Sequence, residues 1–357
     1  MGQSDINIFG TRLKLARKLA AMSLQDLSDA LSNKVTKQAL SKYEQGEMNP
    51  SSQVLLAISK ALQLKPDYFL KKKSLALGQI LFRKRAALSK KDEDSIVEKV
   101  RDYVERYIEL EEILNVQSGF INPLRDFVIE QKSDVEKAAD KLRIDWNLGD
   151  KPIANMVEML ELKGIKVIVV DDVDALDGLA VFTSTGIPIL VVNRKNKSIE
   201  RIRFTIVHEL AHLLLNLAVV EGSHKLQEEW CHFFSSCFLM PSHMLRKMIG
   251  GEKRTYIYIN ELIKIKEYYG ISIRAIVHRL RELVIITDNY YQRWLVYMSK
   301  QYGQKGEPGE YKGEEASKGF DLLIARGLSE GILSLSKAAS LCNTDINILR
   351  KEYVSIH

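Results

Sequence analysis

The first seventy residues consist of short amphipathic segments separated by polar turns. Apolar positions recur at helical spacing within residues 9–20, which predicts a first helix. Ser23 and Thr36 each precede a further apolar run and are expected to cap its helix, while Gly46 is expected to end the second of these helices. A fourth helix is predicted after Pro50. This pattern predicts a small helical bundle over residues 1–70.

The pattern changes twice after this bundle. Residues 71–145 are rich in charge and keep a long helical period, which predicts a solvated helical connector. From about residue 150, helical segments alternate with the strand-like runs IKVIVV, LAVFTST and IPILVVN, and the last two are expected to pair as a hairpin around Gly186. We therefore expect a mostly α-helical chain with one small α+β domain and a helical tail. The expected division is into residues 1–70, 71–145, 146–300 and 301–357.

Composition favours a globular chain without a membrane segment. The sequence has 357 residues, of which 46% are hydrophobic and 27% charged, and it is too long for one ordinary core. No apolar run approaches the ~18 residues of a membrane span, and the first residues lack a basic start followed by an apolar stretch. A cytoplasmic location and no membrane partner are therefore expected. The net charge of +6 permits nucleic-acid binding, and three cysteines without a CxxC pair argue against a disulfide framework or a four-cysteine zinc site.

One helical segment carries three polar residues within an otherwise apolar run. Residues 204–215 read FTIVHELAHLLL, in which His208 and His212 stand four apart. This spacing puts both side chains on one face of a helix, where two imidazoles can bind one Zn²⁺ at about 2.0–2.1 Å each. Glu209 leans toward the same side and can accept a proton from a water that the metal activates. The alternative is a chance match by histidines that are satisfied within the core.

A zinc site of this kind needs a third protein ligand and leaves one position open for water. The downstream segment LQEEWCHFFSSCFLMP offers Glu228 and, four residues later, His232. We expect Glu228 to be the ligand, with His232 as the alternative. Whichever of the two does not bind the metal would orient a ligand histidine. His224 is a weaker candidate, because a solvent-exposed loop histidine has the same sequence context.

The two stretches RIRFTIVHELAHLLL and EEWCHFFSSCFLMP together resemble the ImmA/IrrE family of zinc metallopeptidases. The resemblance covers roughly residues 150–300 and implies a gluzincin-like fold and hydrolysis of peptide bonds. It implies His208 and His212 as zinc ligands, Glu228 as the acidic third ligand and Glu209 as the general base. His232 stands where the family usually has Asn or Asp.

Residues 9–69, which include SLQDLSDALSNKVTKQALSKYEQGEMNPS, resemble the helix-turn-helix of the Xre and lambda-repressor type. The second helix of such a unit lies in the major groove of DNA and reads base edges from its N-terminal half. The resemblance implies double-stranded DNA as a partner and a homodimer, because one module buries little surface. The alternative is a generic bundle with surface lysines. Base edges are expected to be read by Lys37, Gln38 and Lys42, and phosphates to be bound by Gln25, Thr36 and Ser41.

Two functions fit these motifs. The first is a DNA-binding transcriptional regulator with a zinc-dependent endopeptidase that cleaves a repressor, an antitoxin or the chain itself. The best candidate for self-cleavage is the charged connector around residues 82–94, and the strand at 187–193 is either a substrate-pairing edge or an ordinary core strand. The second function is a DNA-binding regulator or antitoxin whose peptidase-like domain only senses or binds a partner, such as a toxin.

Overall fold

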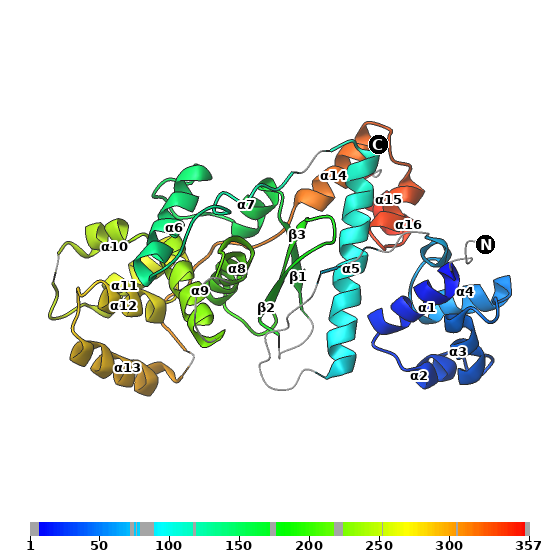
Figure 1. Cartoon of the computed structure of the whole chain (residues 1–357), viewed down its shortest axis with the longest axis horizontal. Helices are drawn as coiled ribbons and strands as arrows, with labels where there is room; N and C mark the ends of the chain where they lie inside the picture. The colour runs from blue at the N-terminus through cyan, green and yellow to red at the C-terminus, as the bar shows by residue number, and fades with distance from the viewer. Residues whose placement is uncertain are drawn as a thin grey trace. The chain divides into compact units, whose positions relative to one another are not determined.

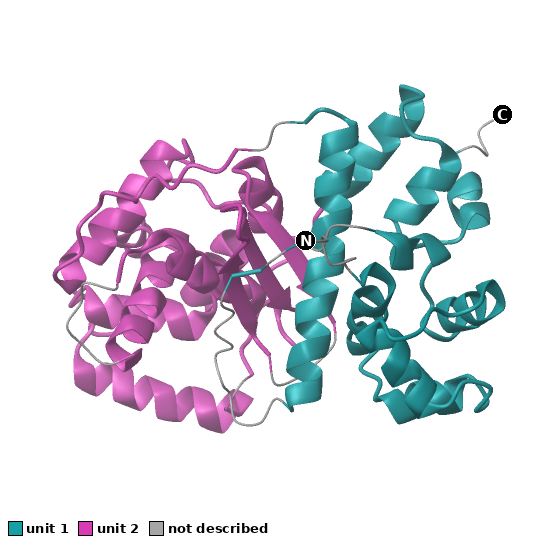
Figure 2. Cartoon of the chain, turned by 45° about the vertical axis from the view of Figure 1, so that its right-hand side comes forward, with its two compact units in different colours: residues 1–78, 82–118, 318–357 teal, residues 79–81, 119–317 magenta. Residues whose placement is uncertain are grey.

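The computed structural model describes residues 7–71, 75, 77–78, 89–116, 119–171, 176–217, 224–251, 253–304 and 306–353. Within these ranges the chain forms sixteen α-helices, one 3-10 helix and a three-stranded sheet, which confirms the expected fold class (Figure 1). None of the helices in the described ranges is both long and apolar enough to cross a membrane. The chain divides into two compact units (Figure 2). Unit 1 is made of residues 1–78, 82–118 and 318–357, and unit 2 of residues 79–81 and 119–317.

The N-terminal part of unit 1 is a helical bundle, as expected. Ser23 and Thr36 cap their helices by accepting hydrogen bonds from the backbone N–H groups of Asp26 and Ala39. Gly46 ends its helix in the left-handed region, at φ 76°, where glycine is favoured. The elements of this N-terminal bundle are α1 (Ile8–Leu19), α2 (Leu24–Ala30), α3 (Lys37–Gln45), α4 (Ser52–Ala61) and the 3-10 helix η1 (Pro66–Leu70).

The remainder of unit 1 is built on the long helix α5 (Lys90–Ile113). Tyr107 and Leu110 of α5 share a buried apolar cluster with Phe320 and Leu349 from the end of the chain. The helices that supply the C-terminal side of this cluster are α14 (Gly319–Ser329), α15 (Leu335–Leu341) and α16 (Ile346–Tyr353). Segments from both ends of the sequence therefore pack on one helix.

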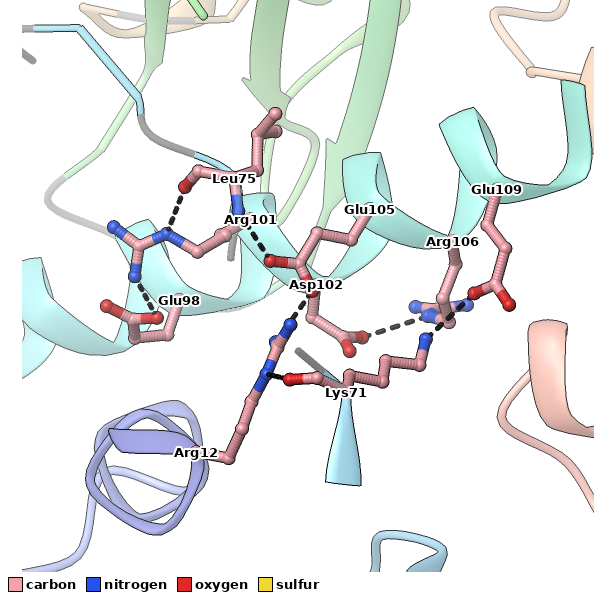
Figure 3. Close-up of polar contacts among 9 residues, drawn as sticks. All are labelled: Arg12, Lys71, Leu75, Glu98, Arg101, Asp102, Glu105, Arg106 and Glu109. Atoms are coloured by element: carbon pink, nitrogen blue, oxygen red, sulfur yellow. Dashed lines mark hydrogen bonds and ion pairs between the residues drawn. The ribbon is translucent and has the colours of Figure 1, made fainter. Parts of the chain in front are cut away.

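Polar contacts join the N-terminal bundle to α5 (Figure 3). Arg12 of α1 is buried, pairs with Glu105 at 2.7 Å and donates to the backbone carbonyl of Lys71 at 3.1 Å. Lys71 in turn pairs with Glu109 at 2.9 Å. Glu109 also pairs with Lys337 of α15. One carboxylate on α5 thus connects the end of the N-terminal bundle with the C-terminal helices.

Unit 2 contains the sheet, whose strand order is β1–β3–β2. The strands are β1 (Lys166–Val170), β2 (Gly178–Phe182) and β3 (Pro188–Asn193); β1 is parallel and β2 antiparallel to β3. β2 and β3 form the hairpin expected around Gly186, which has φ 83°. All six residues of β3 are buried and both of its edges are paired. Its suggested role as a substrate-pairing edge is therefore wrong, and β3 is an ordinary core strand.

Helices of unit 2 pack against this sheet. Helix α8 packs against β2 and β3, and α9 packs against both α8 and α6. The described helices of unit 2 are α6 (Lys132–Asp145), α7 (Met156–Leu162), α8 (Ile199–Leu214), α9 (His224–Leu239), α10 (Ser242–Ile249), α11 (Ile259–Tyr269), α12 (Ile273–Glu282) and α13 (Asp288–Tyr302).

Residues 71–145, expected as one helical connector, contribute α5 to unit 1 and α6 to unit 2. The expected tail, residues 301–357, is likewise shared between the two units at residue 318. These two units are defined by contacts alone and do not test which segments fold as separate domains. The division into four domains therefore stays a prediction. Residues 82–88 of the candidate cleavage segment lie outside the described ranges.

Candidate metal centre and DNA interface

Helices α8 and α9 bring the expected metal-binding residues together. His208 Nε2 lies 3.4 Å from Glu228 Oε2, and His212 Nε2 lies 3.7 Å from Glu228 Oε1. One donor atom from each of the three residues lies within 4.8 Å of the other two. His208 and His212, four residues apart on α8, therefore face Glu228, which lies one turn into α9.

This donor set fits a zinc ion. Two ligands about 2.0–2.1 Å from a tetrahedral ion stand about 3.3–3.4 Å apart, which is close to both histidine–glutamate distances. Two imidazoles and one carboxylate are also a set that zinc takes when a fourth position is left for water. The His208 side chain is only 6% exposed, whereas those of His212 and Glu228 are 26% and 23% exposed. The His212 and Glu228 side chains are thus partly exposed, although the His212 Nε2 atom itself is buried.

Glu209 follows His208 on α8 and is buried. It packs so closely on Gly178 of β2 that a Cβ built at that glycine would lie 2.9 Å from Glu209 Cγ. The same Cβ would lie 2.8 Å from Thr205 Cγ2 and 3.0 Å from the backbone oxygen of Val191. Because Gly178 has no side chain, α8 can lie close to the sheet, and the resulting contact with β2 restricts the position of Glu209. Gly178 could not be singled out from the sequence, because no motif marks a strand glycine that faces a helix later in the chain.

His232 and His224 lie beside the donor group. The ring of His232 is 4.3 Å from that of His208 and stacks on Phe204 at 5.7 Å between centroids. His224 Nε2 lies 3.9 Å from Glu228 Oε1, but the His224 side chain is 78% exposed. Among the described residues, the group of three donors within 4.8 Å includes Glu228 and neither of these histidines. This geometry favours Glu228 as the third ligand and His232 as a neighbour that restricts the His208 ring.

A thiol faces the second ring nitrogen of His212. Cys231 Sγ lies 3.7 Å from His212 Nδ1, and Cys231 is fully buried. Partners at the second nitrogen orient a ligand histidine and tune its basicity. Cys231 could not be singled out from the sequence, because an isolated cysteine on an apolar helix has no characteristic spacing.

In the N-terminal bundle, α3 buries Leu40 and Tyr43 and leaves its opposite face exposed. Of the six residues expected at DNA, Ser41 is half-buried, and the exposed ones are Gln25, Thr36, Lys37, Gln38 and Lys42. Thr36 also caps α3, and Gln25 donates to Asp29 at 2.9 Å. The exposed face of α3 therefore offers an amide and two ammonium groups, which suit base edges in a major groove.

Comparison with models of protein families gives two matches. Residues 13–69 match the model described as helix-turn-helix. Residues 161–281 match the model of the peptidase M78 family, described as the IrrE N-terminal-like domain. A search of curated proteins finds no match. The exposed face of α3 lies within the first range and the three metal-binding candidates within the second. Residues 13–69 are thus similar to helix-turn-helix domains, and residues 161–281 are similar to the IrrE N-terminal-like domain of the peptidase M78 family.

Proposed function

We propose that the chain is a DNA-binding transcriptional regulator with a zinc-dependent endopeptidase that cleaves a repressor, an antitoxin or a related regulatory protein. The proposal rests on the convergence of His208, His212 and Glu228, with Glu209 beside His208 on the same helix. A zinc ion held by the three donors would polarise the scissile carbonyl and lower the pKa of water toward ~7. The helix-turn-helix supports the regulatory part of the proposal.

Glu209 is proposed as the general base. Its carboxylate would take a proton from the attacking water and pass it to the leaving amine. Proton transfer needs the acceptor held in a fixed place, and packing of Glu209 on Gly178 supplies that restraint. Cys231 and His232 would limit the rotation of the His212 and His208 rings.

DNA recognition is proposed for the exposed face of α3. Gln38 would read adenine and Lys37 and Lys42 would read guanine, while Gln25, Thr36 and Ser41 bind phosphates. A homodimer is proposed, because one helix-turn-helix covers only half of an operator.

The test combines metal analysis of the purified full chain with a cleavage time course on candidate repressors and antitoxins. The wild-type chain is expected to hold about one zinc ion, and His208→Ala to lose most of it. Glu209→Gln is expected to keep zinc and DNA binding but to lose cleavage, because the metal ligands survive and only the proton acceptor is removed. Glu229→Gln, a change at the exposed neighbour of Glu228, is the matched control and should behave as wild type.

Three results would contradict the proposal in different ways. Unchanged zinc content in both His208→Ala and His212→Ala would show that the metal site is wrong. Equal cleavage by wild type and Glu209→Gln would exclude Glu209 as the base. A zinc-loaded chain that cleaves none of the candidates but binds one of them, or a toxin, would make the domain a sensing or partner-binding module.

A further inference from the structure

Positive charge and tyrosine are concentrated in one part of unit 2. Between residues 242 and 307 there are twelve lysines and arginines against six acidic residues, an excess equal to the net charge of the whole chain. The same segment holds eight of the fourteen tyrosines. A basic surface with interleaved aromatic side chains is the composition that nucleic-acid-binding surfaces use. The segment lies outside the matched helix-turn-helix, so its composition needs a separate explanation.

Helix α13 arranges part of this composition along one face. Tyr290, Arg293, Tyr297 and Lys300 are separated by three, four and three residues, which places them in one row on a helix. Arg293, Tyr297 and Lys300 are exposed, and Tyr290 is half-buried. The row therefore alternates rings and cations over about 15 Å. The side of α13 that packs on the protein carries the buried Trp294 and Met298, and Tyr290 also packs against this core. Arg293, Tyr297 and Lys300 are exposed and are not part of the core.

Two further tyrosines extend the row at its Tyr290 end. The Tyr256 ring lies 6.5 Å from the Tyr290 ring and 4.9 Å from the Tyr258 ring, both edge to face. Tyr256 is 57% exposed and Tyr258 is 68% exposed. The Tyr290 hydroxyl accepts from the Ile257 N–H at 3.1 Å and donates to the Ile257 carbonyl at 3.3 Å, which fixes the segment 256–258 against α13. Mutual contact restricts the rings before any ligand arrives, which reduces the entropy lost on binding.

Guanidinium groups lie beside these rings. Burial raises the pKa of Tyr290, and the nearby Arg254 and Arg293 oppose that rise. Arg254 is already paired with Glu261 at 3.1 Å. Arg293 is exposed and donates to the Asn289 carbonyl at 3.4 Å, and it forms no ion pair with the residues that the structure describes. A ligand on this surface would meet Arg293 and Lys300 as positive charges next to open aromatic rings.

We propose that the surface formed by Tyr256, Tyr258, Tyr290, Arg293, Tyr297 and Lys300 binds single-stranded nucleic acid. The cations suit phosphates, and the exposed rings suit unpaired bases, on which they can stack without sequence preference. Bases of a duplex are stacked on one another and leave no face for these rings, so duplex DNA would use only the cations. The site would thus be chemically distinct from the duplex-binding face of α3.

The test is fluorescence anisotropy of a fluorescein-labelled twenty-nucleotide oligo-thymidine with the full-length chain at several salt concentrations. Tyr297→Ala is expected to weaken binding about tenfold, whereas Tyr297→Phe keeps the ring and most of the affinity. Tyr268→Ala is the matched control, because Tyr268 is 56% exposed but lies at the other end of α11. Arg293→Ala is expected to reduce the slope of log affinity against log salt by about 0.7.

Two comparisons separate this site from the other proposals. Lys42→Ala is expected to weaken duplex binding and leave oligo-thymidine binding unchanged, and Glu209→Gln is expected to bind oligo-thymidine as wild type does. The proposal is overturned if the wild-type chain does not bind oligo-thymidine, or if Tyr297→Ala and Tyr268→Ala bind it equally. Binding of an acidic peptide to the same surface in place of the oligonucleotide would also overturn it.

Discussion

Replacing Gly178 with alanine should separate the positioning of Glu209 from metal binding. The added Cβ would lie 2.9 Å from Glu209 Cγ and 2.8 Å from Thr205 Cγ2, whereas ordinary contacts begin near 3.4 Å. It would also lie 3.0 Å from Val191 O, which belongs to the backbone of the central strand and cannot move away alone. Helix α8 must therefore shift from the sheet by about 0.5 Å, the shortfall in the Glu209 contact.

The size of the effect follows from this shift. Overpacking a tight contact of this kind costs about 1–3 kcal/mol in the free energy of unfolding. A displacement of 1 Å in a catalytic group costs about 100-fold in rate, so half that displacement should cost about tenfold. The three metal donors are not among the contacts of the added Cβ, and zinc content should stay near one ion per chain.

Urea unfolding gives the stability change, metal analysis gives zinc content, and the cleavage time course gives the rate. Gly119→Ala is the control, because a Cβ built there meets nothing within 4 Å. Wild-type stability and cleavage in Gly178→Ala would refute the argument that this glycine confines Glu209. Loss of zinc together with activity would instead show that the strand holds the whole metal centre.

Three further predictions concern other parts of the chain. Glu315→Ala should lower the free energy of unfolding by about 3–5 kcal/mol in urea titrations, because it leaves the buried Arg203 without its carboxylate and removes the acceptor for the backbone N–H groups of Met156 and Val157. Glu314→Ala, at the exposed neighbour, should change the free energy of unfolding little, and equal effects of the two changes would refute this explanation. Gln38→Ala and Lys42→Ala should each weaken operator binding by about 1–3 kcal/mol and relax base preference, as measured by gel shift on operator and mutated duplexes. Equal losses of affinity on every sequence would instead make Gln38 and Lys42 phosphate contacts. Burial raises the pKa of Glu109, but hydrogen bonds from Lys337 and Lys71 outweigh burial and lower the pKa. The ionised Glu109 therefore stabilises the fold above the unfolded pKa of about 4.3, and this stabilisation is lost as pH falls through the lower folded value. The free energy of unfolding of Glu109→Gln, measured against pH, should fall less in this acid range than that of wild type, and identical pH profiles would contradict the role given to Glu109.

Local signals carried most of what the sequence predicted. The spacing of His208 and His212 fixes both on one helix face, and the caps Ser23 and Thr36 are decided within three residues of themselves. Helix geometry makes such short-range relations nearly independent of the rest of the fold. The elements of the N-terminal bundle and the hairpin around Gly186 were predictable for the same reason.

The parts that could not be predicted depend on contacts between distant segments. Arg106 of α5 donates to the carbonyl of Leu341, 235 residues later in the chain. Glu315 accepts hydrogen bonds from the start of α7, about 160 residues earlier. Gly178 matters only because Glu209 lies against it. No periodicity or spacing encodes these pairings, because each partner alone is an ordinary residue in its own segment.

The contacts between the N-terminal bundle and α5 bear on what a cut in the connector would achieve. If the chain were cleaved within residues 82–88 of the candidate segment, Arg12 would still pair with Glu105 and Lys71 with Glu109, and the Leu19 carbonyl would still accept from Ser95 Oγ at 3.0 Å. Cleavage would convert an intramolecular contact into an association of two fragments, which dilution can then separate. Breaking the peptide bond and releasing the DNA-binding part would be two events in time, and the second would proceed at the dissociation rate of the nicked complex.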